Sequence, residues 1–578
     1  MRLVPELRRR NVFRMAVLYA IAAWLIMQVA DVLNDLANLP DWVGPIVLGL
    51  LAVGFPIALI LSWFYEITPA GISLEKEVDR PESITRMTGR RLDFIVISLL
   101  CAAIILFAFD KWWIGEPPQQ SIAVLPFENM SADPTQEYFS NGISEELLNL
   151  LTKIPELRVI SRSSAFSYKG KAIDTRTIAE QLNVAHVLEG SVRKAGNQVR
   201  ITAQLIEART DTHLWSATYE RTLDDIFATQ DEIASKVVQQ LKLTLLGDAP
   251  TVQATDPEAY SLVLQARYLV QRGTPDATEK SIALLEQALA IDPDYAPAWS
   301  MLAGAYMSQA DDGLRPIDEG YTLARESVSQ ALVLDLAYAP AHRMLGWIAD
   351  NYDRDFVAAA QHYERALALE PANTSGADSL AADLGRLDQA ISLAEYAVAR
   401  DPVNPIRHSN LGRFYRNAGR LDEAIASLRT ALTLSPGKNG AQHLIGTALL
   451  FKGEPESALA AMKMEVDEGW RLIGLVMVHH ALGQAAASDE ALADLIEKYE
   501  QDAAYNIAYV LAFRGEADRA FEWLNKAVTY NDPGLSEIAT EPPFGNIQFD
   551  PRWLPFLESI GMSAAQLAVI EFKVTLPE

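Results

Sequence analysis

Hydrophobic positions in the C-terminal half of the chain recur with the spacing of paired amphipathic helices. From Asp256 to Pro533 the pattern repeats with a period of about 34 residues, which indicates stacked helical hairpins. Several units close on the strings ALAIDP, ALALEP and AVARDP, where proline lacks the amide N–H that would continue a helix. The pattern therefore predicts an all-α superhelix of roughly seven or eight units with a shortened fourth. These units begin at Asp256, Asp294, Tyr338, Asn373, Asn404, Lys438, Trp470 and Ala503.

Strand and helix patterns alternate in the region that precedes the repeats. The string SIAVLPF, from Ser121 to Phe127, is a short apolar run typical of a buried strand. Residues 143–154 have helical spacing, with Ser140 and Asn141 as candidate N-caps. Further strands are predicted at 157–161, 186–193, 199–207 and 214–221, and a short helix at 178–182. Together they predict a small α/β domain over residues 121–247.

Three apolar segments lie near the N-terminus, at residues 13–33, 43–64 and 92–109. Each is long enough to cross a bilayer core, which takes about 20 helical residues. Basic residues cluster before the first segment and between the second and third, whereas the link between the first two carries acids and no base. Because Lys and Arg near a span stay in the cytoplasm, this predicts transmembrane helices with a cytoplasmic N-terminus. The alternative is that the segments are buried core helices.

Charge and cysteine content exclude several classes of protein. The formal net charge is -26, which argues against a nucleic-acid partner, because binding to phosphates needs clustered Lys and Arg. The single cysteine, Cys101, cannot form a disulfide within the chain. No phosphate-binding loop, nucleophile elbow or metal-ligand spacing is visible. We therefore predict no catalytic residue, no cofactor and no metal, and a protein that is not an enzyme.

The clearest repeat is NPIRHSNLGRFYRNAGRLDEAIASLRTALTLSP, from Asn404 to Pro436. It resembles the tetratricopeptide repeat family, in which the first helices of successive units line a concave groove. The resemblance implies a groove that binds proteins or peptides, over residues 256–533, although the same polar positions could simply be the solvated face of a helix. Aligned on the glycine of this unit, the candidate groove contacts are Arg343, Trp347, Asn351, Arg413, Arg416 and Asn417.

A second resemblance covers the α/β region. The strings SIAVLPFENMSADPTQEYFSNGISEEL and VAHVLEGSVRKAGNQVRITAQLIEARTDTHLWSATYERTLDDIFATQDEIA resemble the TolB amino-terminal-like domain. That domain commonly precedes such repeats outside the membrane, as in CadC-type regulators and repeat-bearing adenylate cyclases. Because only about a dozen residues precede the first apolar segment, we expect no counterpart of the cytoplasmic effector domains of either group in this sequence. The last segment, 534–578, resembles the closing segment of the repeat group and is expected to cap the final helix.

The predicted fold class is therefore multidomain. It comprises a membrane domain (1–113) with three transmembrane α-helices, a linker (114–120), a small α/β TolB-like domain, a tetratricopeptide-repeat superhelix and a C-terminal cap. We predict a bacterial inner-membrane location, with the bilayer as a partner and the large C-terminal part in the periplasm. The predicted function is a scaffold that binds protein or peptide partners. The alternative is a sensor that relays ligand binding to a separate cytoplasmic regulator, and a membrane-bound enzyme ranks third. The oligomeric state stays open.

Overall fold

The structure is a computed structural model that describes residues 120–154, 156–241, 252–271, 274–311 and 314–576. Near the N-terminus it describes only residues 16, 19–20, 23, 26, 51, 54–56, 65–68 and 71–74. The chain forms two compact units, Met1–Glu116 and Pro117–Glu578, which are described separately.

The described part of the first unit is small. It contains an antiparallel hairpin of β1 (Tyr65–Thr68) and β2 (Gly71–Leu74), which the hydropathy pattern did not predict. Elsewhere in this unit, the Tyr19 hydroxyl donates a 2.8 Å hydrogen bond to the Leu51 carbonyl.

The predicted fold class is wrong in its transmembrane helices. Among the described residues, none of the helices combines the length and the apolar composition that a bilayer crossing demands. Segments 13–33 and 43–64 lie largely, and 92–109 entirely, outside the described residues. An apolar run fixes the composition of a segment and does not by itself establish a helix of membrane-spanning length. The bilayer, predicted as a partner from the same segments, has no support in the described helices.

The second unit begins with an α/β domain built on a mixed sheet. Its strand order is β5-β3-β6-β7-β8, and β4 also pairs with β6. β3 is parallel to β5 and β6, whereas β6, β7 and β8 are antiparallel. The strands are β3 (Ser121–Val124), β4 (Glu128–Asn129), β5 (Arg158–Val159), β6 (His186–Ala195), β7 (Gln198–Glu207) and β8 (Thr212–Thr222). The helices are η2 (Pro134–Gln136), α5 (Glu137–Thr152), α6 (Arg162–Phe166), α7 (Thr175–Leu182), η3 (Leu223–Asp225) and α8 (Ile226–Gln240).

Helices cover both faces of this sheet. Leu147 of α5 and Val237 of α8 pack in one core with Ile201 and Leu205 of β7, and Leu182 of α7 packs with the other face. The strands predicted from the sequence are confirmed, including the alternation of buried and exposed positions along β7. The predicted caps Ser140 and Asn141 are wrong, because α5 begins earlier, at Glu137.

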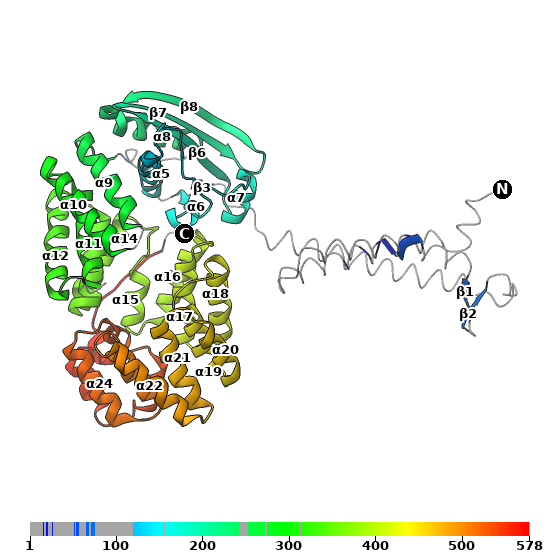
Figure 1. Cartoon of the computed structure of the whole chain (residues 1–578), viewed down its shortest axis with the longest axis vertical. Coiled ribbons are helices and arrows are strands. Elements are labelled where there is room, and N and C mark those ends of the chain that lie inside the picture. The colour runs from blue at the N-terminus through cyan, green and yellow to red at the C-terminus, as the bar shows by residue number, and fades with distance from the viewer. Residues whose placement is uncertain are drawn as a thin grey trace. The chain divides into compact units, whose positions relative to one another are not determined.

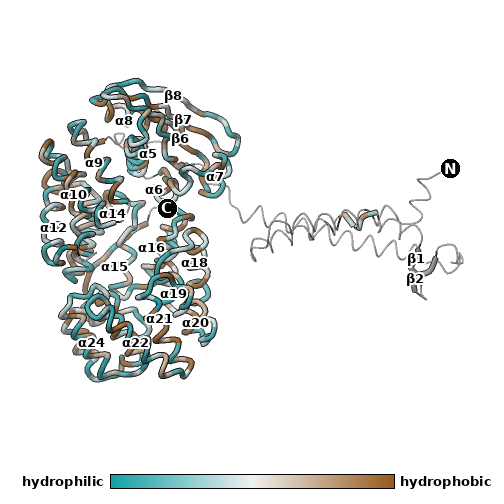
Figure 2. The backbone as a smooth tube through the Cα atoms, viewed as in Figure 1, coloured by the Kyte–Doolittle hydropathy of each residue, from teal (hydrophilic) through white to brown (hydrophobic). Residues whose placement is uncertain are grey.

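The repeats follow as consecutive helix pairs (Figure 1). They are α9 (Pro257–Val270) with α10 (Pro275–Ile291), α11 (Ala296–Asp311) with α12 (Ile317–Leu334), α13 (Ala339–Trp347) with α14 (Phe356–Leu369), α15 (Ala377–Asp383) with α16 (Leu387–Arg400), α17 (Pro405–Asn417) with α18 (Leu421–Leu434), α19 (Ala441–Phe451) with α20 (Pro455–Met464), α21 (Glu468–Ala481) with α22 (Ala485–Tyr499), and α23 (Ala504–Phe513) with α24 (Ala517–Thr529). Brown and teal residues alternate along these helices in Figure 2, as expected for helices with one packed face.

The sequence predicted where these helices end. The second helix stops before Pro293, Pro371 and Pro402 in the three units that carry the ALAIDP, ALALEP and AVARDP strings. The shortened fourth unit is confirmed by the short α15. The hydropathy pattern did not predict the π-helical turn η4 (Ile348–Asp353), into which α13 continues.

The last segment closes the array. It contains η5 (Pro533–Glu537), η6 (Pro542–Asn546), α25 (Trp553–Ser559) and α26 (Ala564–Ala568). The rings of Trp553 and Phe556 lie 6.4 and 6.3 Å from that of Phe521 on α24. This segment therefore covers the last repeat helix, as a terminal repeat requires.

The α/β domain contacts the repeats at two separate places. Near the first unit, Leu264 of α9 lies against Gly142 of α5. Near the fourth, Arg158 donates a 2.9 Å hydrogen bond to the Ala399 carbonyl, and Arg400 donates a 3.1 Å bond to the Leu157 carbonyl. The domain therefore bridges α9 and α16, as Figure 1 shows.

Candidate functional site

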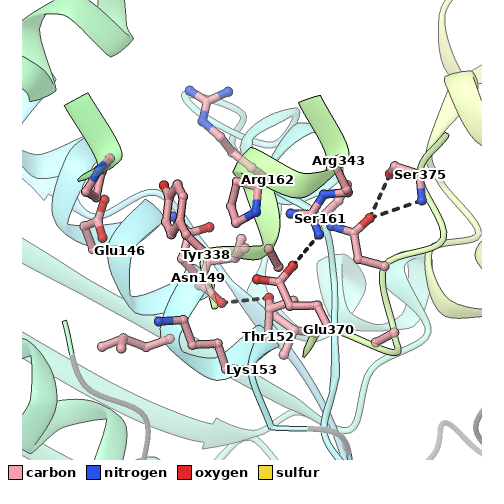
Figure 3. Close-up of a pocket in the computed structure, with 18 of the residues that line it drawn as sticks. Glu146, Asn149, Thr152, Lys153, Ser161, Arg162, Tyr338, Arg343, Glu370 and Ser375 are labelled. Carbon is pink, nitrogen blue, oxygen red and sulfur yellow. Dashed lines mark hydrogen bonds and ion pairs between the residues drawn. The ribbon is translucent and has the colours of Figure 1, made fainter. Parts of the chain in front are cut away.

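A cavity of about 790 Å³ lies where the α/β domain meets the repeats (Figure 3). We call it the junction cavity. Its wall comes from α5 and the β5 region on one side and from the first, second, third, fourth and fifth repeat units on the other. The bridge between the domain and the repeats therefore creates the site, which neither part would form alone.

The charged lining of the junction cavity is mainly basic. Cations outnumber acids among its residues: the cations are Lys153, Arg162, Arg267, Arg343, Arg400 and Arg407, and the acids are Glu146, Asp335, Glu370 and Asp401. In a chain with a net charge of -26, such a local excess of positive charge favours an anionic ligand.

Some of these cations are already neutralised. Arg343 forms a 2.7 Å ion pair with Glu370, and Figure 3 shows the two side chains meeting at the cavity wall. Arg267 pairs with Glu146 at 2.5 Å across the contact between α9 and α5. The Arg267–Glu146 pair joins the repeats to the α/β domain, and the Arg343–Glu370 pair joins the two helices of the third repeat unit.

Other cations form no ion pair with a carboxylate within the described part of the chain. Arg407 donates a 2.6 Å hydrogen bond to the Ser375 hydroxyl, and its charge also acts on the buried carboxyl of Asp378, whose pKa burial raises and Arg407 lowers. Arg400 binds only the Leu157 carbonyl and the Tyr396 hydroxyl. Lys153 is exposed at the edge of the cavity. Burial, followed by the neighbouring Arg400, lowers the pKa of Arg158, and Asp401 acts in the opposite direction. Guanidinium groups of this kind can bind a carboxylate or phosphate with two parallel hydrogen bonds.

The structure distributes the six predicted groove contacts over three places. Arg343 lines the junction cavity. Trp347 and Asn351 line a second cavity further along the repeats. The remaining predicted contacts, Arg413, Arg416 and Asn417, contact the C-terminal segment of the same chain.

That third group is bound to residues 537–541. Arg413 forms an ion pair with Glu537, and Arg416 forms one with Glu541 at 2.7 Å. Asn417 donates a 3.5 Å hydrogen bond to the Thr540 hydroxyl. The side chains of Arg416 and Glu541 are only 2% and 5% exposed. That all six residues bind a peptide stays a prediction, but these three already contact this chain's own acidic segment.

Several residues of the junction cavity were not among the predicted contacts. Lys153 belongs to the α/β domain, so no alignment of the repeats could find it. Arg400 and Arg407 lie at the end of one repeat and the start of the next, outside the positions that line a repeat groove. The basic residues around the AVARDP string were a sequence signal from which this part of the cavity could have been predicted. Within the described residues, we find no group of three or more His, Cys, Asp or Glu placed to hold a metal ion.

Comparison with known families gives two matches. Residues 379–439 match the tetratricopeptide repeat family. Residues 118–236 match the second domain of HilA/YgeH-like transcriptional regulators. The second match covers the α/β domain, for which the sequence had suggested a TolB-like relative, and a TolB-like domain is not shown.

Comparison with individual proteins gives one curated relative and several solved structures. The chain is 42% identical over 198 residues to a putative adenylate cyclase 3 of Rhizobium meliloti (strain 1021), which is 33% of this chain and 34% of that protein. The chain thus spans about a third of that relative's length. PilW, a type IV pilus biogenesis factor, is 20% identical, with 43% of this chain and 96% of that chain covered and a TM-score of 0.26. Pseudomonas aeruginosa pilF is 17% identical, with 42% and 93% covered and a TM-score of 0.24. TM-scores this low carry no argument about function.

Proposed function

Because the chain carries tetratricopeptide repeats, we propose that it is a protein-interaction scaffold whose junction cavity binds an acidic segment of a partner protein. The observation that carries the proposal is the group of cations around this cavity that form no ion pair among the described residues, Lys153, Arg400 and Arg407. A partner's Asp or Glu side chain, or its terminal carboxylate, would supply the missing negative charge.

The size and position of the cavity support the proposal. A volume of about 790 Å³ is within the range of sites that bury a small ligand, and a few residues of an extended peptide fit in it. The wall is already held by the Arg343–Glu370 and Arg267–Glu146 pairs. A prearranged site loses less conformational entropy on binding than a flexible one.

The test is fluorescence anisotropy of the full chain with a short labelled peptide of Asp and Glu. The reference peptide has Asn and Gln at the same positions. We expect the acidic peptide to bind more tightly than its neutral analogue, and we expect its affinity to fall as the salt concentration rises. Arg407→Gln is expected to raise its Kd roughly tenfold, the effect of losing about 1.4 kcal/mol.

A matched control is available on the outer surface. Arg429 of α18 is exposed and lies outside the cavity lining, so Arg429→Gln changes the net charge equally and should leave the Kd unchanged. Equal affinity for the acidic and neutral peptides, or equal effects of the two variants, would contradict the proposal.

Signal relay is a second candidate function. It is favoured by the match of residues 118–236 to a domain of HilA/YgeH-like transcriptional regulators. In this case ligand binding at the junction cavity would change which proteins contact the N-terminal unit, residues 1–116. Crosslinking in cells with and without Arg407→Gln tests it, and an identical set of N-terminal partners would count against a relay.

A location of the repeats in the periplasm, at the bacterial inner membrane, is a separate proposal supported only by the charges of the sequence. Alkaline phosphatase fused to the C-terminus, which is active only outside the cytoplasm, is expected to be active. An active β-galactosidase fusion at the same position would refute this location.

A further inference from the structure

The second cavity has six aromatic residues in its lining, Tyr321, Trp347, Tyr352, Trp470, Tyr505 and Tyr530. It has a volume of about 860 Å³, and we call it the aromatic cavity. Its wall is formed by the ends of α11 and α13, by α12 and η4, and by the starts of α21 and α23, together with the segment from Tyr530 to Glu537. The predicted contacts Trp347 and Asn351 both lie in it. The acidic ligand proposed for the junction cavity does not account for this site.

Three of its rings are parallel. Tyr321 and Tyr352 stack at 4.3 Å between centroids with 3° between their planes, and Tyr321 and Trp347 stack at 5.9 Å with 11°. Tyr321 is buried at 3% exposure, whereas Trp347 and Tyr352 are only partly buried. Trp470 adds a ring that is 39% exposed. The stack therefore leaves flat ring surface accessible at the cavity.

Hydrogen-bond donors in the aromatic cavity lack acceptors. Within the described residues, the indole N–H of Trp347 and the side-chain amide of Asn506 have no hydrogen-bond partner. The hydroxyl of Tyr505 is buried and likewise has none. Burying the Tyr505 hydroxyl without a partner costs free energy, whereas Trp347 and Asn506 are only partly buried. A ligand that brings acceptors would be favoured here.

The charges of this cavity are mainly negative. Arg315 is its cation, and it already pairs with Glu319. Asp502 is exposed at the edge. Asp532 accepts hydrogen bonds from the amides of Tyr505 and Gly534. The aromatic cavity is therefore opposite in sign to the junction cavity, and the two sites call for different groups on a ligand.

We propose that the aromatic cavity binds a proline-rich segment in the polyproline II conformation, with a basic residue beside it. This inference rests on the proposed function as a protein-interaction scaffold and names the second class of segment that the scaffold recognises. Proline rings pack on flat aromatic faces, and proline-rich segments dock in aromatic-lined grooves in several unrelated domains.

The donors fit this class of ligand for a specific reason. A proline has no N–H, so a proline-rich segment offers carbonyl acceptors and few donors. The unpartnered donors at Trp347, Tyr505 and Asn506 complement those carbonyls. A proline-rich segment is already extended before it binds, so it loses less conformational entropy on binding than a flexible segment does. Asp502 would attract the neighbouring Lys or Arg of the ligand.

The experiment measures fluorescence anisotropy of a short labelled proline-rich peptide with an arginine at each end, added to the full chain. In the comparison peptide, alanine replaces every proline. We expect the proline peptide to bind and the alanine peptide to bind at least several-fold more weakly. Trp347→Ala and Tyr352→Ala are each expected to raise the Kd roughly tenfold or more, as for aromatic residues at the centre of an interface.

A matched control tests whether the rings act through the site. Trp299 of α11 lies outside the cavity lining and donates its indole N–H to the Pro293 carbonyl at 2.8 Å, so Trp299→Ala should leave the Kd unchanged. If Trp347→Ala fails to fold by circular dichroism, Asn506→Ala removes a donor and leaves the stacked rings in place. Trp347→Phe keeps a ring without the N–H and should give an intermediate Kd.

The outcomes separate the two proposals. Equal binding of the proline and alanine peptides, or an unchanged Kd in the folded variants, overturns the proline-rich ligand. If the acidic peptide still binds at the junction cavity in the same preparation, the scaffold function stands and only this inference fails. If neither peptide binds, both proposals fail.

Discussion

The buried Arg416 site and the junction cavity use the same kind of side chain in opposite ways. At the first, Arg416 is fully enclosed and paired with Glu541. At the second, Arg400 and Arg407 form no ion pair with a carboxylate among the described residues. Both arginine sets lie on repeat helices or at their junctions, and sequence pattern does not separate them. At Arg416 the chain itself supplies the carboxylate. At Arg400 and Arg407 it supplies no ion-pair partner, so only these two can pair with a carboxylate of another molecule.

A consequence is that a repeat groove must be examined for occupation by its own chain. Residues 537–541 cover the predicted contacts Arg413, Arg416 and Asn417. Ile538 of this segment and Leu535 just before it are buried, which indicates that the segment is a permanent part of the fold. We expect substitutions of charged groups to have smaller effects on stability as the group changes from fully enclosed to exposed and unpartnered.

The largest effect is expected at Arg416. Arg416→Met leaves the buried Glu541 carboxylate without its cation, and removing one partner of a buried pair typically costs about 3–5 kcal/mol. The free energy of unfolding is measured by urea titration. The double variant with Glu541→Gln should recover much of the loss, because it leaves no buried charge. Equal losses in the single and double variants would show that the ion pair is not the cause.

The next effect concerns pH. Asp350 is fully buried, and neither carboxyl oxygen has a hydrogen-bond partner among the described residues. Burial, followed by the nearby Glu537, raises the pKa of Asp350 from 3.8 to about 7. Between these values the folded chain keeps a proton that the unfolded chain has released. This contribution to stability is therefore complete below about pH 4 and is lost as the pH rises to about 7.

Asp350→Asn removes that titration. We expect the stability of the variant relative to the parent to improve by roughly 2–3 kcal/mol between about pH 5 and about pH 8. Urea unfolding at both pH values measures it. A parallel pH dependence of the two proteins would mean that Asp350 keeps an ordinary pKa.

A smaller effect is expected at the partly buried pair. Arg343 and Glu370 are 18% and 15% exposed, so water screens them more than it screens Arg416. Arg343→Met should lower the free energy of unfolding by about 1–2 kcal/mol. A loss as large as that of Arg416→Met would show that the exposed fraction of the side chains does not determine how much each ion pair stabilises the fold.

The smallest effect is expected at an unpartnered cation. Lys153→Gln should change the free energy of unfolding by less than about 0.5 kcal/mol, because no ion pair is broken. The same variant should still weaken binding of the acidic peptide. Thermal unfolding combined with anisotropy separates these readouts, and a large drop in stability would argue that Lys153 has a structural role instead.

Much of the fold could be predicted because it depends on local pattern. The helix pairs follow from periodicity, and their ends follow from Pro293, Pro371 and Pro402, which act on their own neighbours. The strands follow from alternation, as along β7. The π-helical turn at 348–353 could not be predicted in this way, because no residue in that stretch marks a change of helix type.

The site was harder to predict because it depends on contacts between distant residues. Arg416 and Glu541 are 125 residues apart in the chain, and no spacing rule connects them. The junction cavity likewise needs Lys153 and Arg407 to meet across two domains. Trp347 was found for its place on a groove-facing helix, but its stacking with Tyr321 on a different helix could not be inferred from position alone.

The two attachments of the α/β domain have a mechanical consequence. A helical-repeat array that is held at only one end can twist and extend along its axis. Here the Arg158–Ala399 bond joins residues separated by 241 positions, and a second attachment holds α9 to α5. The α/β domain thus connects the first and fourth units and closes the first four units into a loop. A molecule that inserts between these units must therefore distort both attachments.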